Sequence, residues 1–236
     1  MRMRKKKHSA ERIAACSDFL IGDPALFYGR SRDIFGNDAP ILLEIGCGKG
    51  DFALGLAERN ENSNVIAVER IPDVAMFALE KAKADFERRK ASREAEENGG
   101  AAPVRDNLRV LIGNADYLSD WFAPGTFSGL YINFCDPWPK KGYYKRRLTA
   151  PGFLAMYRKI LKPGSILEFK TDHGELFSWS LEQFAAAGFE ILKISEDLHG
   201  EADLSFNIET EHERKFSAEG KPICFARVRI TSGGEG

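Results

Sequence analysis

The sequence predicts an α/β fold in which one doubly wound, seven-stranded sheet, mostly parallel, carries helices on both faces. Three observations support this prediction. Apolar runs of strand length alternate with helix-like stretches along most of the chain. A glycine-rich turn follows the first of these runs. The last two apolar runs have no convincing helix between them, which predicts an antiparallel end of the sheet.

The predicted elements follow one another regularly along the chain. Apolar runs predict parallel strands at 41–46, 64–70, 108–115, 128–134 and 165–172. Helix-like stretches lie near 51–60, 73–97, 116–122, 149–161 and 174–187. The runs at 189–195 and 222–230 predict the antiparallel pair. A Lys-Pro-Gly turn at 162–164 ends one helix, and Gly188 ends the next.

Length and composition indicate one globular domain. The 236 residues contain no long Pro, Gly or Ser linker, so we expect a single domain over 18–232 after a basic tail at 1–17. A formal net charge of -1 excludes a global basic field, so any nucleic-acid surface must be a local patch. The four scattered cysteines predict a reducing compartment and no metal site, and the absence of a long apolar segment predicts a cytoplasmic protein away from membranes.

The first strand leads into a turn that is typical of nucleotide binding. Gly46, Gly48 and Gly50 form a GxGxG pattern, which departs from the GxGxxG dinucleotide fingerprint. Glu44 precedes them at the strand end, where a carboxylate can receive an ammonium group. Glu69 ends the second strand, where acidic residues bind ribose hydroxyls in this fold class.

Asn114 and Asp116 lie at the end of the third strand, where they are suited to the amino edge of an adenine. Ribose, adenine and an amino-acid ammonium group together make up S-adenosylmethionine, and a generic nucleotide binder is the alternative. The fourth strand ends in Asn-Phe-Cys-Asp-Pro-Trp-Pro-Lys-Lys, in which two prolines stiffen the loop around Asp136. For Trp138 in this loop, packing into the core is the favoured interpretation.

A basic segment with interleaved aromatic residues follows this loop. Its members are Lys140, Lys141, Tyr143, Tyr144, Lys145, Arg146 and Arg147. Such a pattern is typical of contact with phosphates and bases, although a solvated face has the same composition. Asp172 ends the fifth strand, and Thr-Glu-His-Glu at 210–213 lies before the last one, where a polar loop is the simpler interpretation.

The motifs LEIGCGKG, AVER, NFCDPWPKKGYYKRRL, FKTD and TEHERKF occur in this order. With them, the chain resembles the bacterial tRNA (guanine-N7-)-methyltransferases from about residue 18 to residue 230. The resemblance implies a Rossmann-like class I methyltransferase that moves a methyl group from S-adenosylmethionine to N7 of guanine 46 in the tRNA variable loop. It implies tRNA as the partner, no metal, and a monomer or homodimer that needs no other protein.

The resemblance also implies a set of site residues. The donor would be bound by Glu44, Gly46, Gly48, Glu69, Asn114 and Asp136, with Asp136 also the catalytic acid. The tRNA would be bound by Lys140, Asp172, Thr210, Glu211, His212 and Glu213. Two other functions stay open: methylation of an exocyclic amino group of RNA, and a non-catalytic RNA-binding protein that keeps the methyltransferase fold.

Overall fold

The computed structural model of the chain describes residues 8–94, 104 and 106–231. One sheet organises them, with the strand order β1-β4-β3-β2-β5-β6-β8-β7. The strands are β1 (Leu20–Ile21), β2 (Ile41–Ile45), β3 (Asn64–Glu69), β4 (Leu108–Ile112), β5 (Phe127–Asn133), β6 (Leu161–Thr171), β7 (Phe189–Ser195) and β8 (Cys224–Ile230). The helices are α1 (Ser9–Ala14), α2 (Asp51–Arg59), α3 (Pro72–Glu94), α4 (Leu118–Trp121), α5 (Pro151–Ile160), α6 (Gly174–Ala186) and α7 (Glu211–Ala218).

The predicted seven strands are all present, and the mostly parallel α/β fold is confirmed. Neighbouring strands from β1 to β6 run parallel, while β8 runs antiparallel to both β6 and β7. The structure adds an eighth strand, β1, beside β4. Because β1 has only two residues, it carries no alternating pattern that a sequence could reveal.

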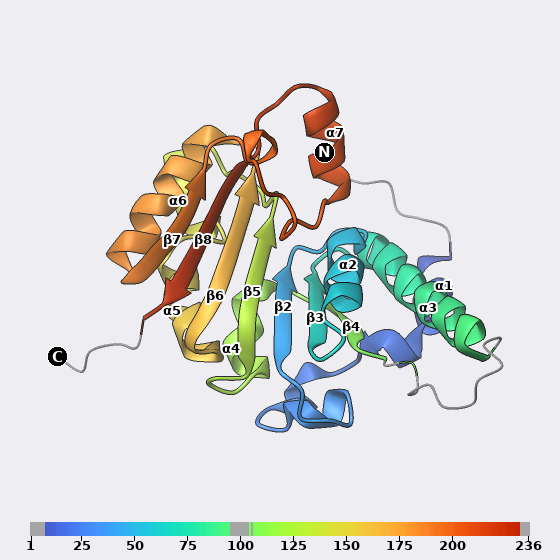
Figure 1. Cartoon of the computed structure of the whole chain (residues 1–236). Coiled ribbons are helices and arrows are strands. Elements are labelled where there is room, and N and C mark those ends of the chain that lie inside the picture. The colour runs from blue at the N-terminus through green and yellow to red at the C-terminus, as the bar shows by residue number, and fades with distance from the viewer. Residues whose placement is uncertain (1–7, 95–103, 105, 232–236) are drawn as a thin grey trace.

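Apolar side chains on both faces of the sheet build two cores. Leu43 belongs to a cluster that also holds residues of α4, α5 and α6, such as Leu154 and Leu176. Leu42, its neighbour, belongs to the cluster under α2 and α3 with Leu56 and Leu79. Successive strand residues point to opposite faces, so continuous apolar strands need helices on both sides, as Figure 1 shows.

The order of the strands creates a crevice at their carboxyl ends. From β2 the chain passes outward through β3 and β4, and it then returns to the other side of β2 with β5 and β6. Connections therefore leave β2 and β5 in opposite directions, and open sheets of this kind bind ligands at such a switch point. Helix α7 lies beyond these strand ends (Figure 1).

The N-terminal helix α1 lies within the range expected as a basic tail. Arg12 on α1 donates two hydrogen bonds of 2.6 Å to the Glu80 carboxylate on α3. Residues 1–7, 95–103 and 105 lie outside the described residues. Within the described part of the chain, no helix is both long and apolar enough to cross a bilayer.

Candidate active site

A large cleft occupies the switch point between β2 and β5. Its volume is about 1190 Å³, enough for a nucleoside-sized ligand together with a second group. The loops after β2, β3, β4 and β5 line it, together with the start of α3 and one face of α7. The predicted donor residues Glu44, Gly46, Gly48, Glu69, Asn114 and Asp136 all line this cleft.

The glycine turn after β2 leaves its backbone open to a ligand. Gly46 and Gly48 adopt left-handed φ angles of 78° and 58°, and a Cβ atom at either position would meet no atom within 4 Å. Gly50 is different, because its Cβ would lie 2.7 Å from the Cβ of Ala78 on α3. Two glycines thus keep the cleft open, and the third lets α2 pack closely against α3.

Glu69 at the end of β3 is already oriented by backbone donors. Its Oε2 accepts a hydrogen bond from the Gly48 amide at 3.1 Å, and its Oε1 accepts one from the Ile71 amide at 2.9 Å. The carboxylate thereby joins the glycine turn to the start of α3. Its half-buried position in the cleft suits it to ribose hydroxyls.

Glu44 is the most deeply buried carboxyl group of the cleft, with 1% of its surface exposed. Asn133 Nδ2 donates to its Oε1 at 3.2 Å, while its Oε2 has no hydrogen-bond partner among the described residues. Burial raises the pKa of Glu44 from 4.5 to about 7, against the opposing effect of the Asn133 hydrogen bond. A cationic ligand would supply the missing partner.

Asn114 and Asp116 lie together after β4. Asn114 Nδ2 donates to Asp116 Oδ2 at 2.8 Å, and the Asp116 amide approaches Asn114 Oδ1 at 3.4 Å. Apolar side chains of Ile71, Val74 and Phe77 line the same cleft from the start of α3. Amide and carboxylate groups beside an apolar wall form a suitable environment for a planar base.

The loop after β5 carries Asp136 on a strained backbone. Phe134 and Trp138, on either side of it, have φ angles of 52° and 40°, which non-glycine residues rarely adopt. The Phe134 ring stacks on His212 of α7, with centroids 6.0 Å apart. The Trp138 ring contacts Tyr143 edge-on and lies under the Arg146 guanidinium, 5.0 Å from its centroid. Asp136 itself is exposed and lines the cleft.

Arg147 corrects one part of the sequence interpretation. The sequence places it in the basic segment proposed to contact phosphates and bases, but its side chain has no exposed surface. Its Nε donates to the Pro137 carbonyl at 2.8 Å, and its guanidinium lies 3.6 Å from the centroid of the Tyr144 ring. Only the packing of η5, a 3-10 helix at Lys141–Arg146, against α6 turns this side chain inward.

The segment expected as a polar loop is helix α7. Thr210 accepts a hydrogen bond from the Glu213 amide at 2.9 Å, and the Glu213 carboxylate reaches back to the Thr210 amide, which makes a capping box. The spacing Thr-x-x-Glu is the sequence signal for such a helix start, and it was overlooked because few apolar residues follow it. Thr210, Glu211 and His212 line the cleft.

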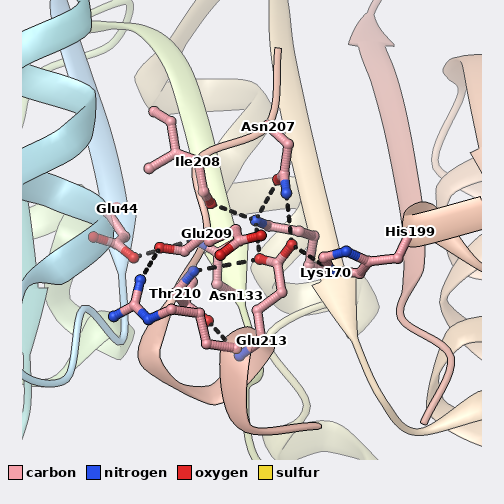
Figure 2. A network of polar contacts seen from close by, with 10 residues as sticks. Glu44, Asn133, Lys170, His199, Asn207, Ile208, Glu209, Thr210 and Glu213 are labelled. Carbon is pink, nitrogen blue, oxygen red and sulfur yellow. Dashed lines mark hydrogen bonds and ion pairs between the residues drawn. The ribbon is translucent and has the colours of Figure 1, made fainter. Parts of the chain in front are cut away.

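Glu213 points away from the cleft into a buried polar network (Figure 2). It has no exposed surface, and Lys170 of β6 donates to its Oε2 at 2.7 Å. Lys170 also donates to the Asn207 side chain and the Ile208 carbonyl, at 2.9 and 2.8 Å. His199 Nε2 lies 3.2 Å from Glu213 Oε1, without the alignment of a hydrogen bond. Sequence reasoning missed Lys170, although a lysine inside an otherwise apolar strand is a recognisable signal.

Comparisons with known proteins agree with this geometry. A family model described as "Putative methyltransferase" matches residues 38–226. The tRNA (guanine-N(7)-)-methyltransferase of Bacillus subtilis (strain 168) is 40% identical over 228 residues, which cover 97% of this chain and 98% of the relative. The enzyme of the same name from Lactococcus lactis subsp. cremoris is 39% identical and covers 94% of this chain and 95% of its own.

The chain belongs to the tRNA (guanine-N7-)-methyltransferase family. Solved structures support the fold alone. The 16S rRNA methyltransferase KamB superposes with a TM-score of 0.59 at 16% identity, over 86% of this chain and 94% of its own. A 16S rRNA (adenine(1408)-N(1))-methyltransferase from Catenulisporales acidiphilia gives a TM-score of 0.54 at 15% identity, over 99% of this chain and 97% of its own. The predicted class I methyltransferase fold is therefore confirmed.

In this member of the tRNA (guanine-N7-)-methyltransferase family, basic side chains from four elements surround the cleft. They are Lys49, Arg70, Lys145, Arg146 and Lys215, and we call them the basic rim. Lys49 is paired with Glu211 at 2.7 Å across the cleft. The remaining predicted substrate residues are Lys140, directly before η5, and Asp172, at the end of β6, and both are exposed outside the cleft lining. The described residues contain no group of three His, Cys, Asp or Glu side chains suited to a metal ion.

Proposed function

We propose that this protein transfers a methyl group from S-adenosylmethionine to N7 of a guanine in tRNA, at guanine 46 of the variable loop. The observation that carries the proposal is the convergence, in one cleft, of the buried Glu44 carboxyl group, one oxygen of which has no partner among the described residues, and the Asp-Pro-Trp-Pro loop beneath a basic rim. Identity of 40% to a relative named for this activity, along nearly the whole chain, supports it.

The described residues fit the methyl donor. Glu44 offers an unpaired oxygen to an amino-acid ammonium group, and the open turn at Gly46 and Gly48 admits a ligand next to the backbone. Glu69 would hold the ribose hydroxyls, and Asn114 would hold the adenine edge. When bound, S-adenosylmethionine supplies a methyl group on a positively charged sulfur.

Guanine N7 carries a lone pair and no proton, so the protein needs no general base to prepare it. Its main task is placement, because alignment of the reacting atoms contributes up to about 7 to 11 kcal/mol of barrier reduction. Positive charge moves onto the guanine during transfer. The Asp136 carboxylate would favour this movement and would orient the base through its N1 and N2 hydrogens.

The proposed substrate surface joins the basic rim to the segment after Asp136. Lys140 and Arg146 would contact phosphates on one side of the cleft, and Thr210, Glu211 and His212 of α7 would border the base on the other. We leave Glu213 out of the direct contacts, because its carboxylate is buried and paired with Lys170. Asp172 stays a proposed contact at the end of β6.

Labelled methyl transfer onto tRNA tests this proposal. Wild-type protein should label tRNA that has guanine at position 46 and should not label the same tRNA with adenine there. Nuclease digestion and mass spectrometry should give N7-methylguanosine. A methyl group on an exocyclic nitrogen would instead favour the amino-methyltransferase alternative. Failure to bind S-adenosylmethionine in calorimetry would favour the non-catalytic RNA-binding protein.

A further inference from the structure

Arg147 is a buried cation whose contacts are mostly backbone and ring. Its Nε donates to the Pro137 carbonyl at 2.8 Å, and its Nη2 lies 3.4 Å from the Trp138 carbonyl. Its Nη1 has no hydrogen-bond partner among the described residues. The carboxylate nearest to it, Glu175 on α6, is 3.4 Å away and largely exposed. A buried charge whose counter-ion is distant and exposed to solvent destabilises the fold. A contribution of Arg147 to stability therefore does not explain why an arginine is buried at this position.

Aromatic rings hold the guanidinium in one orientation. Its central carbon lies 3.6 Å from the centroid of the Tyr144 ring and 4.6 Å from that of Trp179 on α6. Tyr144 is itself fixed, because its hydroxyl donates to Glu175 at 2.8 Å. These contacts tie the guanidinium to both η5 and α6. The side chain is therefore a rigid fork directed at the loop after β5.

The two carbonyl groups that Arg147 contacts belong to the two residues after Asp136. In the same stretch, Trp138 holds a left-handed φ of 40°, a conformation that persists only where the surroundings impose it. The prolines at 137 and 139 fix their own φ angles but cannot impose that of Trp138. Arg147 is buried and contacts the carbonyl groups of the two peptide units that flank the Trp138 Cα, those of Pro137 and Trp138.

We propose that Arg147 is a positioning residue. It holds the Pro137–Trp138 backbone so that the Asp136 carboxylate faces the cleft next to the base that reacts. The inference rests on the proposed function. It assigns Arg147 no contact with tRNA, and so separates it from Arg146, its neighbour on the basic rim.

The substitution Arg147→Lys keeps the charge but removes the planar fork. Arg158→Lys is the matched control, because Arg158 also donates to backbone carbonyls, those of Ala187 and Thr231, far from the cleft. At saturating donor and tRNA, we expect kcat of Arg147→Lys to fall about 100-fold, as for a catalytic group displaced by roughly 1 Å. The KM for tRNA and its salt dependence should stay unchanged, and Arg158→Lys should keep kcat.

Retention of kcat in folded Arg147→Lys would overturn the inference, as would a loss confined to tRNA affinity and its salt dependence. If Arg147→Lys does not fold, Glu175→Gln replaces it, since Glu175 is on the surface. We expect a smaller loss of kcat with an unchanged KM for tRNA, and full activity of Glu175→Gln would contradict the proposal.

A measurement without RNA separates this inference from the proposed function. In protein labelled with 5-fluorotryptophan, the ¹⁹F resonance of Trp138 should shift or broaden in Arg147→Lys, while that of Trp121 should not. An unmoved Trp138 resonance would refute the positioning role. Absence of N7-methylguanosine with wild-type protein would refute the proposed function alone.

Discussion

At the scale of single residues, the cleft contains groups in states that are unfavourable without a ligand or a neighbour to fix them. Glu44 is a carboxyl group removed from water with one oxygen unpaired. Trp138 holds a backbone conformation suited to glycine. Such costs concentrate at functional sites, where the surrounding structure imposes them.

Glu44 should make the stability of the donor-free protein depend on pH. Its pKa is raised from 4.5 to about 7 in the folded state, so its stabilising contribution is complete below about pH 4.5 and is lost as pH rises through 7. Glu44→Gln stays neutral. Between pH 4.5 and 8 the wild type should lose stability that the variant keeps. The difference in free energy of unfolding, variant minus wild type, should rise by about 3 kcal/mol over this range.

Urea unfolding of both proteins at pH 5 and pH 8 measures this difference. The substitution should also weaken donor binding at pH 8, because the amide has no charge for an ammonium group. A stability difference that is the same at both pH values would show that Glu44 does not titrate in this range.

The left-handed backbone at position 138 can be tested with two small residues. Trp138→Gly and Trp138→Ala both delete the ring, but only alanine is strained by the positive φ, because glycine has no Cβ atom. Trp138→Gly should therefore be more stable than Trp138→Ala by about 1 kcal/mol. At Tyr143, an exposed residue of η5 with ordinary φ, the alanine variant should be the more stable one. Denaturant unfolding of the four variants measures these stability differences. If alanine is the more stable replacement at both positions, the backbone at 138 is not strained.

At the scale of elements, α7 is held in place by one buried ion pair more than by its own sequence. The helix has eight residues, too few for stability in isolation, and Glu213 is its buried side chain. Lys170 anchors Glu213 from β6 and also binds Asn207 and the Ile208 carbonyl in the preceding segment (Figure 2). Lys170 thus fixes the wall of the cleft that carries Thr210, Glu211 and His212.

Removal of one partner of this pair should cost more than removal of both. Lys170→Met leaves the Glu213 carboxylate buried without its cation, and we expect a loss of about 3 to 5 kcal/mol in the free energy of unfolding. Lys170→Met combined with Glu213→Leu leaves no unpaired charge and should recover part of this loss. A double-mutant cycle in urea gives the coupling energy. Additive losses would mean that the two residues stabilise the fold independently.

At the scale of the whole molecule, charge is balanced overall but uneven in space. The formal net charge is -1, yet the basic rim gathers around the cleft mouth from the turns after β2 and β3, from η5 and from α7. A polyanion would be attracted to this local field without a strongly basic protein surface. The cleft is therefore the proposed site of both the chemistry and tRNA docking.

The salt dependence of tRNA binding should identify the phosphate contacts. Lys140→Ala and Arg146→Ala should each reduce the slope of log affinity against log salt concentration by about one unit. Lys90→Ala is the control, because Lys90 lies about 20 Å along α3 from Phe77, the cleft residue of that helix. Unchanged slopes for Lys140→Ala and Arg146→Ala would return these residues to an ordinary solvated face.

The sequence alone determined the order of the elements and several residues that line the cleft. Alternating apolar runs and helix-like stretches predicted β2 to β8 and α2 to α6. The strands were recognisable because a strand buried on both faces is a nearly continuous run of apolar residues. Glu44, Gly46 and Glu69 line one cleft because the carboxyl ends of parallel strands share one edge of the sheet. Asp136 was predicted from the proline loop that carries it.

Only the tertiary structure decided which polar residues face the cleft and which support it. Arg146 and Arg147 are adjacent in one basic run, yet one borders the cleft and the other is buried under the loop. Glu211 and Glu213 differ in the same way on α7. The physical reason is that Tyr144, Trp179 and Lys170, which settle these orientations, come from elements packed together by the fold. The local sequence shows the secondary structure that a segment prefers, whereas the burial of a side chain depends on residues that are distant in the chain.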